Sequence, residues 1–396
     1  MRDVVLHCVV LSVAVAIYAW GPGPALAGAE LALPSAETLV AVASRPFDLA
    51  KAHVALKQLR LRAEAGLADG QTLAPLVEAR HLSWPLAGSY YRVLAAGGQQ
   101  MEPLLLRKVN EESRYDLLAA LALAEPPAAD VTAGLREMAR RSDLRPGTRA
   151  LVALALAARG DRAQQWAEEV ARYLRAASGD GEENERWLVW QAVACAAPKL
   201  RGEQALQEVL WQVAASGAGS ERGWDALIAC ASAAPWDVEQ VRVQELRAKW
   251  LASGDALPCL DRAIIHMALA RLSAGPEADK DALLSAVGGL WDDPSYSGEA
   301  GRVLLFASEL LINDPVARVI QSGLTAESRV TRLGAVRLAM MMGPDAKGML
   351  DALGEVAAGA DPAVAREARR ARVLVGGLDA QGDWVFADDA WLLERL

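Results

Sequence analysis

The sequence predicts an all-α protein, a right-handed α-solenoid of about eight helical hairpins that follow an N-terminal helical cap. Three observations predict this fold. About one residue in five is alanine, whereas there are only three Phe and six Tyr; this composition favours helix over sheet. Pro, Gly and Asp interrupt the chain at intervals of about 12 to 20 residues, and apolar residues at helical spacing fill the intervals. A short sequence pattern that begins with arginine recurs along the chain, as expected for a helical repeat array.

The first residues are typical of an export signal. Arg2 precedes an apolar run over residues 4–20, and Ala25-Leu26-Ala27 then supplies the small residues that a signal peptidase accepts. We expect residues 1–27 to be a signal peptide, with cleavage between Ala27 and Gly28 and a secreted or periplasmic mature protein. The alternative is an uncleaved anchor formed by residues 4–20, because that run is close to the shortest length that spans a bilayer.

Residues 28–98 are predicted to be the N-terminal helical cap. Apolar spacing indicates one long amphipathic helix over Phe47–Gly66 and a second helix that includes Ser89–Ala96. These helices are less regular than the segments that follow. Because the end of a solenoid needs a polar outer face, we interpret the region as a terminal cap.

Residues 99–376 are predicted to be the repeat array. Connections of a few residues make each pair of helices antiparallel. The expected pairs are 99–110 with 113–124, 129–140 with 146–159, 161–177 with 183–197, 201–216 with 220–233, 237–252 with 256–273, 277–290 with 295–312, 315–322 with 327–342, and 345–358 with 362–376.

An arginine opens the second helix of the first seven pairs, at Arg114, Arg149, Arg186, Arg222, Arg262, Arg302 and Arg329. The intervals between them are 35, 37, 36, 40, 40 and 27 residues. Six positions later stands a small residue, Ala120, Ala155, Ala192, Ala268, Ser308 or Ala335, with Ile228 as the exception. A small side chain at a fixed point lets neighbouring helices approach closely, so we expect these positions to be buried.

These units resemble HEAT repeats, most clearly at the end of the array. Asp361-Pro362-Ala363-Val364-Ala365-Arg366-Glu367-Ala368 is similar to the turn between the helices and the second helix of that family, in which Asp caps the helix and Arg packs over the turn. Ala365 departs from the pattern, because the family usually has Val there. The resemblance implies an architecture, not an activity. Tetratricopeptide repeats fit less well, because the repeat length varies and Tyr and Phe are scarce.

The tail, residues 377–396, is predicted to fold over the last hairpin as a C-terminal cap. It contains Gly382, Trp384 and a short helical segment near Trp391. Because no long linker rich in Pro, Gly or Ser interrupts residues 28–396, we expect one continuous unit.

The sequence contains no recognisable catalytic or metal-binding motif. The chain has four His and four Cys, and His53, His81 and His266 are far apart, so we expect no metal and no cofactor. Phosphate-binding glycine loops and a GxSxG nucleophile elbow are also missing. Adjacent carboxylates flank helix starts, where they are expected to favour the helix dipole. No residue is predicted to be catalytic.

Two sets of residues are candidates for a binding surface. Trp211, Trp250 and Trp291 occupy equivalent places in three successive hairpins. A column of indoles on the open face could hold a glycan or a peptide; the alternative is packing in the core. Arg366, Arg369 and Arg370 cluster on the last repeat helix, where they could contact an acidic partner or form a solvated helix face.

Cys195 and Cys230 lie at nearly equivalent points of successive second helices, so we expect their sulfur atoms to be neighbours, either bonded or as two buried thiols. Cys259 is expected to be unpaired.

The sequence therefore predicts an exported protein-interaction scaffold whose partner is a protein or a peptide. The net charge of -9 argues against nucleic acid, and contact with a membrane is expected only through an uncleaved anchor. The alternative is an exported (α/α) toroid that acts on polysaccharide. Such an enzyme would close into a ring and gather acids, Tyr or His at one mouth.

Overall fold

A computed structural model describes residues 34–45, 48–83, 85–176, 183–216, 221–233, 240–252, 259–272, 280–290 and 298–395. Within these ranges the chain forms helices, and its only extended pairing is an isolated antiparallel bridge between Leu378 and Trp384. The predicted signal peptide and Trp291 lie outside the described residues. In the described part of the chain, no helix combines the length and the apolar character needed to cross a bilayer.

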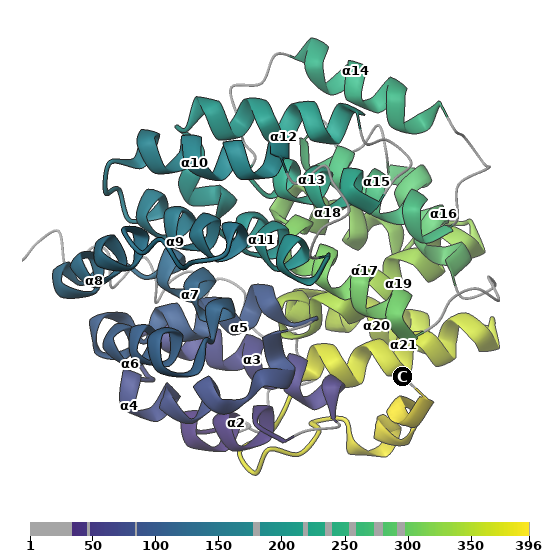
Figure 1. Cartoon of the computed structure of the whole chain (residues 1–396). Helices are drawn as coiled ribbons and strands as arrows, with labels where there is room; N and C mark the ends of the chain where they lie inside the picture. Colours follow the sequence, from purple (N-terminus) through teal and green to yellow (C-terminus); the bar gives the residue numbers. More distant parts are fainter. Residues whose placement is uncertain are drawn as a thin grey trace, which may run out of the picture.

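The helical hairpins appear in the predicted order, with bounds within a few residues of those expected (Figure 1). The first helices are α6 (Gly98–Glu112), α8 (Ala129–Ala139), α10 (Ala163–Ala176), α12 (Gln204–Ser216), α14 (Gln240–Leu251), α16 (Lys280–Gly289), α18 (Asp314–Gly323) and α20 (Leu350–Ala357). The second helices are α7 (Leu118–Leu123), α9 (Pro146–Ala158), α11 (Glu183–Ala196), α13 (Glu221–Ser232), α15 (Cys259–Leu272), α17 (Gly298–Leu311), α19 (Arg329–Met342) and α21 (Pro362–Gly376). The all-α solenoid is confirmed.

Side chains at the turns explain where several helices begin. Asn313 caps α18, Ser328 caps α19 and Asp361 caps α21, each by accepting a hydrogen bond from a backbone N–H of the first turn. The cap predicted for Asp361 is therefore present. The arginine that contacts Asp361 is Arg329 of the preceding hairpin, with 2.7 Å between Nε and Oδ2, whereas Arg366 is exposed.

The second helices form a continuous inner layer. Each contacts the next, from α7 through α9, α11, α13, α15, α17 and α19 to α21. The predicted small-residue positions face this layer, and all of them are buried: Ala120, Ala155, Ala192, Ala268, Ser308 and Ala335, together with the exception Ile228. The burial expected at these positions is confirmed.

The N-terminal region extends the inner layer. It contains α2 (Ala36–Ala43), α3 (Leu49–Glu64), α4 (Gly70–Leu73), the 3-10 helices η1 (Ala74–Glu78) and η2 (Arg80–Ser83), and α5 (Ala87–Ala96). Helix α5 packs against α7, and α3 packs against α5. Helix α3 also contacts α21 and the 3-10 segment η8 (Gly343–Met349) at the other end of the array. The two ends of the solenoid therefore meet, as Figure 1 shows for the purple and yellow segments.

The C-terminal tail joins both ends. Its last segment, η9 (Ala387–Arg395), contacts α21, so the tail covers the last hairpin. The Gln58 amide on α3 exchanges two hydrogen bonds with the backbone of Leu378, each 3.2 Å long. Lys51 Nζ lies 3.5 Å from Asp383 Oδ1, and 5.9 Å from the centre of the Trp384 ring. The tail thus connects the last repeat to the first long helix.

The centre of the closed array is filled with side chains. Helix α5 contacts both α11 and α17, and α13 also contacts α17. These contacts cross the array instead of following it. The inner helices therefore share one apolar core, to which every hairpin contributes.

Candidate functional site

Two of the three tryptophans of the predicted column, Trp211 and Trp250, are buried. Trp250 is 1% exposed and its Nε1 donates a 3.0 Å hydrogen bond to the carbonyl of Ala214 on the preceding hairpin. Trp211 is 9% exposed and belongs to the same core. Neither indole presents a face to a ligand, so a surface role for these two must be corrected to packing between hairpins, the alternative that the sequence left open.

The arginine cluster on α21 divides into exposed and buried members. Arg370 is buried and donates to Glu367 at 2.9 Å, so it supports the helix and does not face a partner. Arg366 and Arg369 are exposed. Their role in binding stays a prediction.

Cys195 and Cys230 are both buried, free thiols. Their helices, α11 and α13, are in contact. Burial raises the pKa of Cys195 to about 12, and burial likewise raises the pKa of Cys230 well above its ordinary value. Both thiols are therefore protonated and act as small apolar groups. The side chain of Cys259 lies outside the described residues.

A buried polar cluster lies where the two ends of the array meet. Ser89 on α5 binds both carboxylate oxygens of Glu309 on α17, through its hydroxyl at 2.8 Å and its backbone N–H at 3.1 Å. His53 on α3 places Nδ1 3.5 Å from Glu309 Oε1 and Nε2 2.9 Å from the carbonyl oxygen of Met341. A Cβ atom at position 88 would lie 2.9 Å from Glu309 Oε2, which explains the glycine there. Three distant segments thus meet at one carboxylate.

An ion network continues this cluster toward the surface. Asp345 in η8 accepts from Lys57 Nζ at 2.7 Å and from Arg60 at 2.9 Å. Burial by itself would raise the pKa of Asp345, but the Lys57 and Arg60 charges hold it below its ordinary value. The same competition applies to Glu309, where burial is outweighed by the contact with His53 and the charge of Lys57, so that its pKa is lowered. Both carboxyl groups are ionised at neutral pH.

The trio of Ser89, Glu309 and His53 does not have the geometry of a nucleophilic centre. A catalytic serine must give its proton to the imidazole, whereas Ser89 donates to the carboxylate and His53 contacts a backbone carbonyl. All three side chains are buried, so a substrate cannot reach them. No group of His, Cys, Asp and Glu in the described residues could hold a metal ion. The cluster therefore fastens α3 and α5 to α17, and α3 to α19, and the ion network fastens α3 to η8.

A second buried ion pair supports the connection between α7 and α8. Glu102 and Arg159 lie 2.6 Å apart, with side chains 1% and 0% exposed. Arg159 also donates to the carbonyls of Leu121 and Ala128, at 3.1 and 2.8 Å, and Glu102 accepts from the N–H of Ala128 at 3.1 Å. The polar groups around this pair are satisfied, so it too serves the fold. Sequence spacing did not indicate either cluster.

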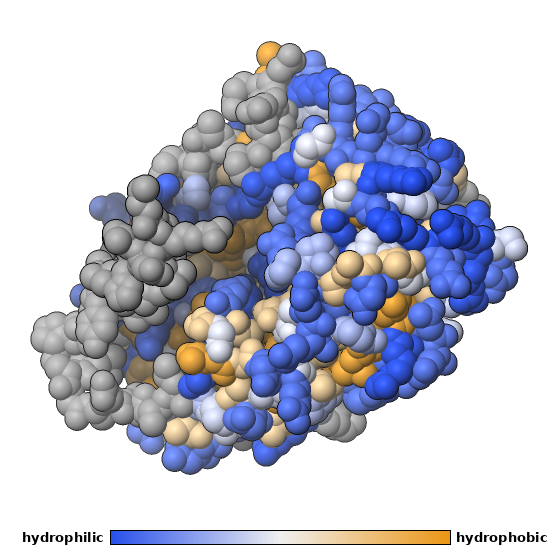
Figure 2. Space-filling view, turned by 90° about the vertical axis from the view of Figure 1, so that its left-hand side faces the viewer, coloured by the Kyte–Doolittle hydropathy of each residue, from blue (hydrophilic) through white to orange (hydrophobic). Residues whose placement is uncertain are grey.

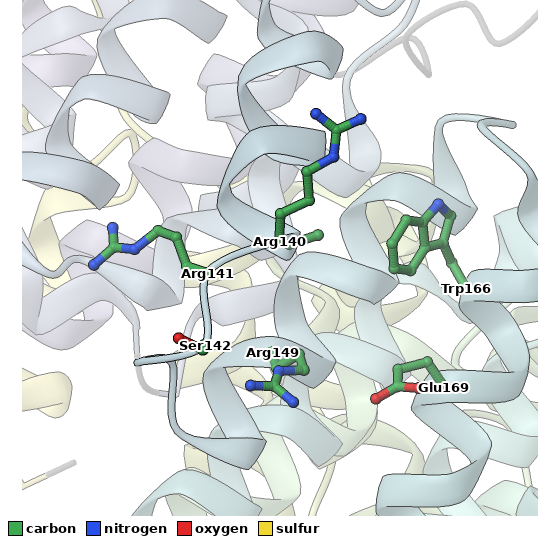
Figure 3. Close-up of a pocket in the computed structure, with 7 residues that line it drawn as sticks. Arg140, Arg141, Ser142, Arg149, Trp166 and Glu169 are labelled. Carbon is green, nitrogen blue, oxygen red and sulfur yellow. The ribbon is translucent and has the colours of Figure 1, made fainter.

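The remaining candidate is a surface pocket of about 340 Å³ beside the start of α9 (Figure 3). Its wall consists of Ala139 at the end of α8, the turn residues Arg140, Arg141 and Ser142, Arg149 in the first turns of α9, and Trp166 and Glu169 on α10. Figure 3 shows Arg149 between Ser142 and Glu169, with Trp166 on the α10 side and the side chains of Arg140 and Arg141 pointing in different directions. No motif or spacing in the sequence indicated this pocket.

The pocket is locally basic in an acidic protein. Residues 136–149 contain five arginines against one aspartate and one glutamate. Three acids near the pocket already have a cation: Asp143 pairs with Arg141, Asp161 with Arg136 and Glu169 with Arg172. The guanidinium groups of Arg140 and Arg149 make no ion pair within the described chain, so they are available to an anion.

Exposed large apolar side chains do not form a continuous stripe. Within the described residues they are Leu61, Leu67, Val241, Val330 and Trp391, on separate elements. Figure 2 shows a mainly hydrophilic face with separate apolar patches. The exposed large apolar side chains of the described residues therefore do not mark one continuous hydrophobic surface.

Comparisons with known proteins found no matching family model and no matching curated protein. Two solved structures show some likeness. A crystal structure of a Kap121p mutant has 14% identity and a TM-score of 0.31, and the match covers 90% of this chain but 42% of that one. A crystal structure of an engineered protein has 17% identity and a TM-score of 0.26, with 85% of this chain and 93% of that chain covered. With TM-scores this low, the class of the protein rests on its own helices, and that class is an all-α helical-repeat solenoid.

Proposed function

We propose that this protein is an exported HEAT-like repeat protein that acts as a protein-interaction scaffold and has no catalytic activity. One observation supports the proposal: the described acid–base clusters with buried side chains, around Glu309 and around Glu102, hold the helices of the array together. Repeated helices expose a surface whose contact area grows with each hairpin. Such a surface suits an extended protein or peptide.

The proposed location follows from the first residues alone. Cleavage between Ala27 and Gly28 would release a mature protein into the periplasm or the medium, and an uncleaved anchor over residues 4–20 would keep it at the membrane. N-terminal sequencing of the protein purified from the host envelope distinguishes them. Gly28 as the first residue supports export with cleavage, and an intact Met1 or Arg2 contradicts it.

The binding role is tested by affinity capture from the envelope fraction of the native host. A tagged chain should enrich one or a few proteins, and the purified partner should bind it in a one-to-one titration. Failure of any purified candidate to bind directly would contradict the scaffold proposal.

The meeting of the two ends favours one second candidate, an exported (α/α) toroid that acts on polysaccharide. A ring of this kind holds its acids in an open mouth at the centre. Here α5, α11 and α17 pack across the centre, and Glu309 is enclosed by Ser89 and His53. Incubation with uronic-acid and neutral polysaccharides, followed by a reducing-end assay, decides between the two. Release of sugar ends would replace the scaffold proposal with the enzyme.

A further inference from the structure

The pocket at the start of α9 contains two arginines that the protein does not neutralise. The side chains of Arg140 and Arg149 make no ion pair and no hydrogen bond with the described residues, and the Nε atom of Arg149 is buried without an acceptor. The terminal nitrogens of a guanidinium group without a carboxylate partner can donate to an anion from outside the chain.

The backbone adds to the positive potential. Helix α9 begins at Pro146, and no side chain caps its N-terminus. The positive end of the helix dipole therefore lies on the same side as Arg149 and favours an anion. Ser142 supplies a hydroxyl at the rim. Together these groups can bind an acceptor with two oxygens, which guanidinium groups match well.

The other walls indicate what kind of anion fits. Trp166 and Ala139 provide apolar surface, and Glu169 places a negative charge on the α10 side. Although Glu169 is paired with Arg172, its carboxylate faces the pocket and repels a phosphate with two charges more than a carboxylate with one. The volume of about 340 Å³ lies at the small end of ligand pockets, which suits one or two side chains instead of a chain of sugars.

We propose that this pocket binds the carboxylate of an aspartate or glutamate side chain of a partner polypeptide, while an apolar neighbour of that residue packs on Trp166. This inference rests on the proposed scaffold function and names one contact of that surface. The carboxylate accepts from Arg149, while Arg140, whose side chain points away from Arg149 in Figure 3, adds positive charge at the exposed rim. The partner is an acidic peptide segment.

The test uses the full chain and a fluorescein-labelled heptapeptide in which a Glu-Leu-Glu core is flanked by serine and glycine. Fluorescence anisotropy compares it with the same peptide carrying Gln-Leu-Gln. We expect the acidic peptide to bind at least tenfold more tightly. Arg140→Gln together with Arg149→Gln should weaken its binding at least tenfold and leave the weak binding of the Gln peptide unchanged.

A matched control removes the same charge elsewhere. Arg107 and Arg318 are exposed on α6 and α18 and have no ion pair in the described chain, and the double variant Arg107→Gln, Arg318→Gln should bind as the parent does. Ser142→Glu provides a second test that does not depend on the half-buried Arg149, because Ser142 is exposed. It should also weaken binding at least tenfold, with an unchanged helical circular dichroism spectrum.

Equal weakening in both double variants would overturn the proposal, because it would reflect net charge and not a pocket. Displacement of the peptide by phosphate, but not by chloride at equal ionic strength, would also overturn it and leave a site for inorganic anions. The scaffold function has a separate outcome. If the Arg140→Gln, Arg149→Gln protein still captures the native partner with parental affinity, the scaffold proposal stands and the pocket proposal fails.

Discussion

Helices α16 and α19 approach so closely that two glycines line their contact. An ideal Cβ atom on Gly334 would lie 1.8 Å from the carbonyl oxygen of Leu284, and one on Gly288 would lie 2.2 Å from the carbonyl oxygen of Val330. Because both obstacles are backbone atoms, no side chain can rotate to make room. Gly334→Ala should therefore force the two helices apart.

The structure gives the size of this effect. Real Cβ atoms essentially never approach another heavy atom within 3.0 Å, so the helices must separate locally by about 1.2 Å. Overpacking of this severity costs about 3 kcal/mol, whereas alanine gains about 1 kcal/mol over glycine inside a helix. We expect Gly334→Ala to lower the free energy of unfolding by about 2 kcal/mol. With a urea dependence of about 3 kcal/mol/M, the midpoint falls by about 0.7 M.

Urea unfolding followed by circular dichroism at 222 nm measures this change. The matched control is Gly354→Ala in α20, where nothing lies within 4 Å of the added Cβ atom. That variant should be more stable than the parent by about 0.4–1 kcal/mol, because alanine reduces the freedom of the unfolded chain. If Gly334→Ala and Gly354→Ala shift the midpoint in the same direction, the close approach of α16 and α19 is wrong.

Three further substitutions test the buried contacts. Asp345→Asn should lower the free energy of unfolding at pH 7 by about 1–3 kcal/mol, because it leaves Lys57 without its counter-charge. Folding lowers the pKa of Asp345 below its ordinary value of 3.8. The difference in unfolding free energy between parent and variant is therefore complete above pH 3.8 and disappears as the pH falls through the lower pKa of the folded state. Urea titrations at several pH values measure this difference, and a difference that does not change with pH contradicts the assignment. Glu102→Gln should cost about 3–5 kcal/mol by leaving Arg159 buried and unpaired, and a loss below about 1 kcal/mol in urea unfolding would refute the dry ion pair. Ala155→Leu should cost about 1–3 kcal/mol in calorimetry, and an unchanged melting temperature would show that this helix face is not packed.

The helices and their order were predictable from the sequence because the information is local. The spacing of apolar residues, the turn residues and the repeated arginine fix where each hairpin lies, and the small residue six positions later predicts burial at Ala155 and Ala192. Side-chain function was harder to predict. Trp250 has the same spacing whether it faces solvent or the neighbouring hairpin, and only the packing of α14 on α12 decides.

The meeting of the ends could not be predicted from a repeat pattern. It depends on the small rotation between successive hairpins, which accumulates over the array. No single residue type or spacing in the sequence indicates the size of that rotation. His53 meets the carbonyl of Met341, 288 residues away. The pocket could not be predicted either, because it also depends on how neighbouring hairpins pack. Arg149 fits the repeated sequence pattern of the second helices, and Trp166 lies on the next hairpin.

The central structural claim is that the solenoid closes, with its C-terminal tail against α3. Carbodiimide cross-linking tests it most directly, because this reagent joins an amine to a carboxylate without a spacer. Lys51 and Asp383 lie 3.5 Å apart, and the aspartate side chain is 74% exposed, so the reagent can reach it. The pair of Lys108 and Glu112, 2.5 Å apart within α6, is the internal control.

Mass spectrometry of the monomer fraction after digestion provides the measurement. The structure predicts a peptide pair linked through Lys51 and Asp383 at a yield similar to the link between Lys108 and Glu112. It also predicts that Asp383→Asn removes the first link and leaves the second. Recovery of the Lys108 link alone from the parent protein would show that the ends are apart and that the array is an open solenoid.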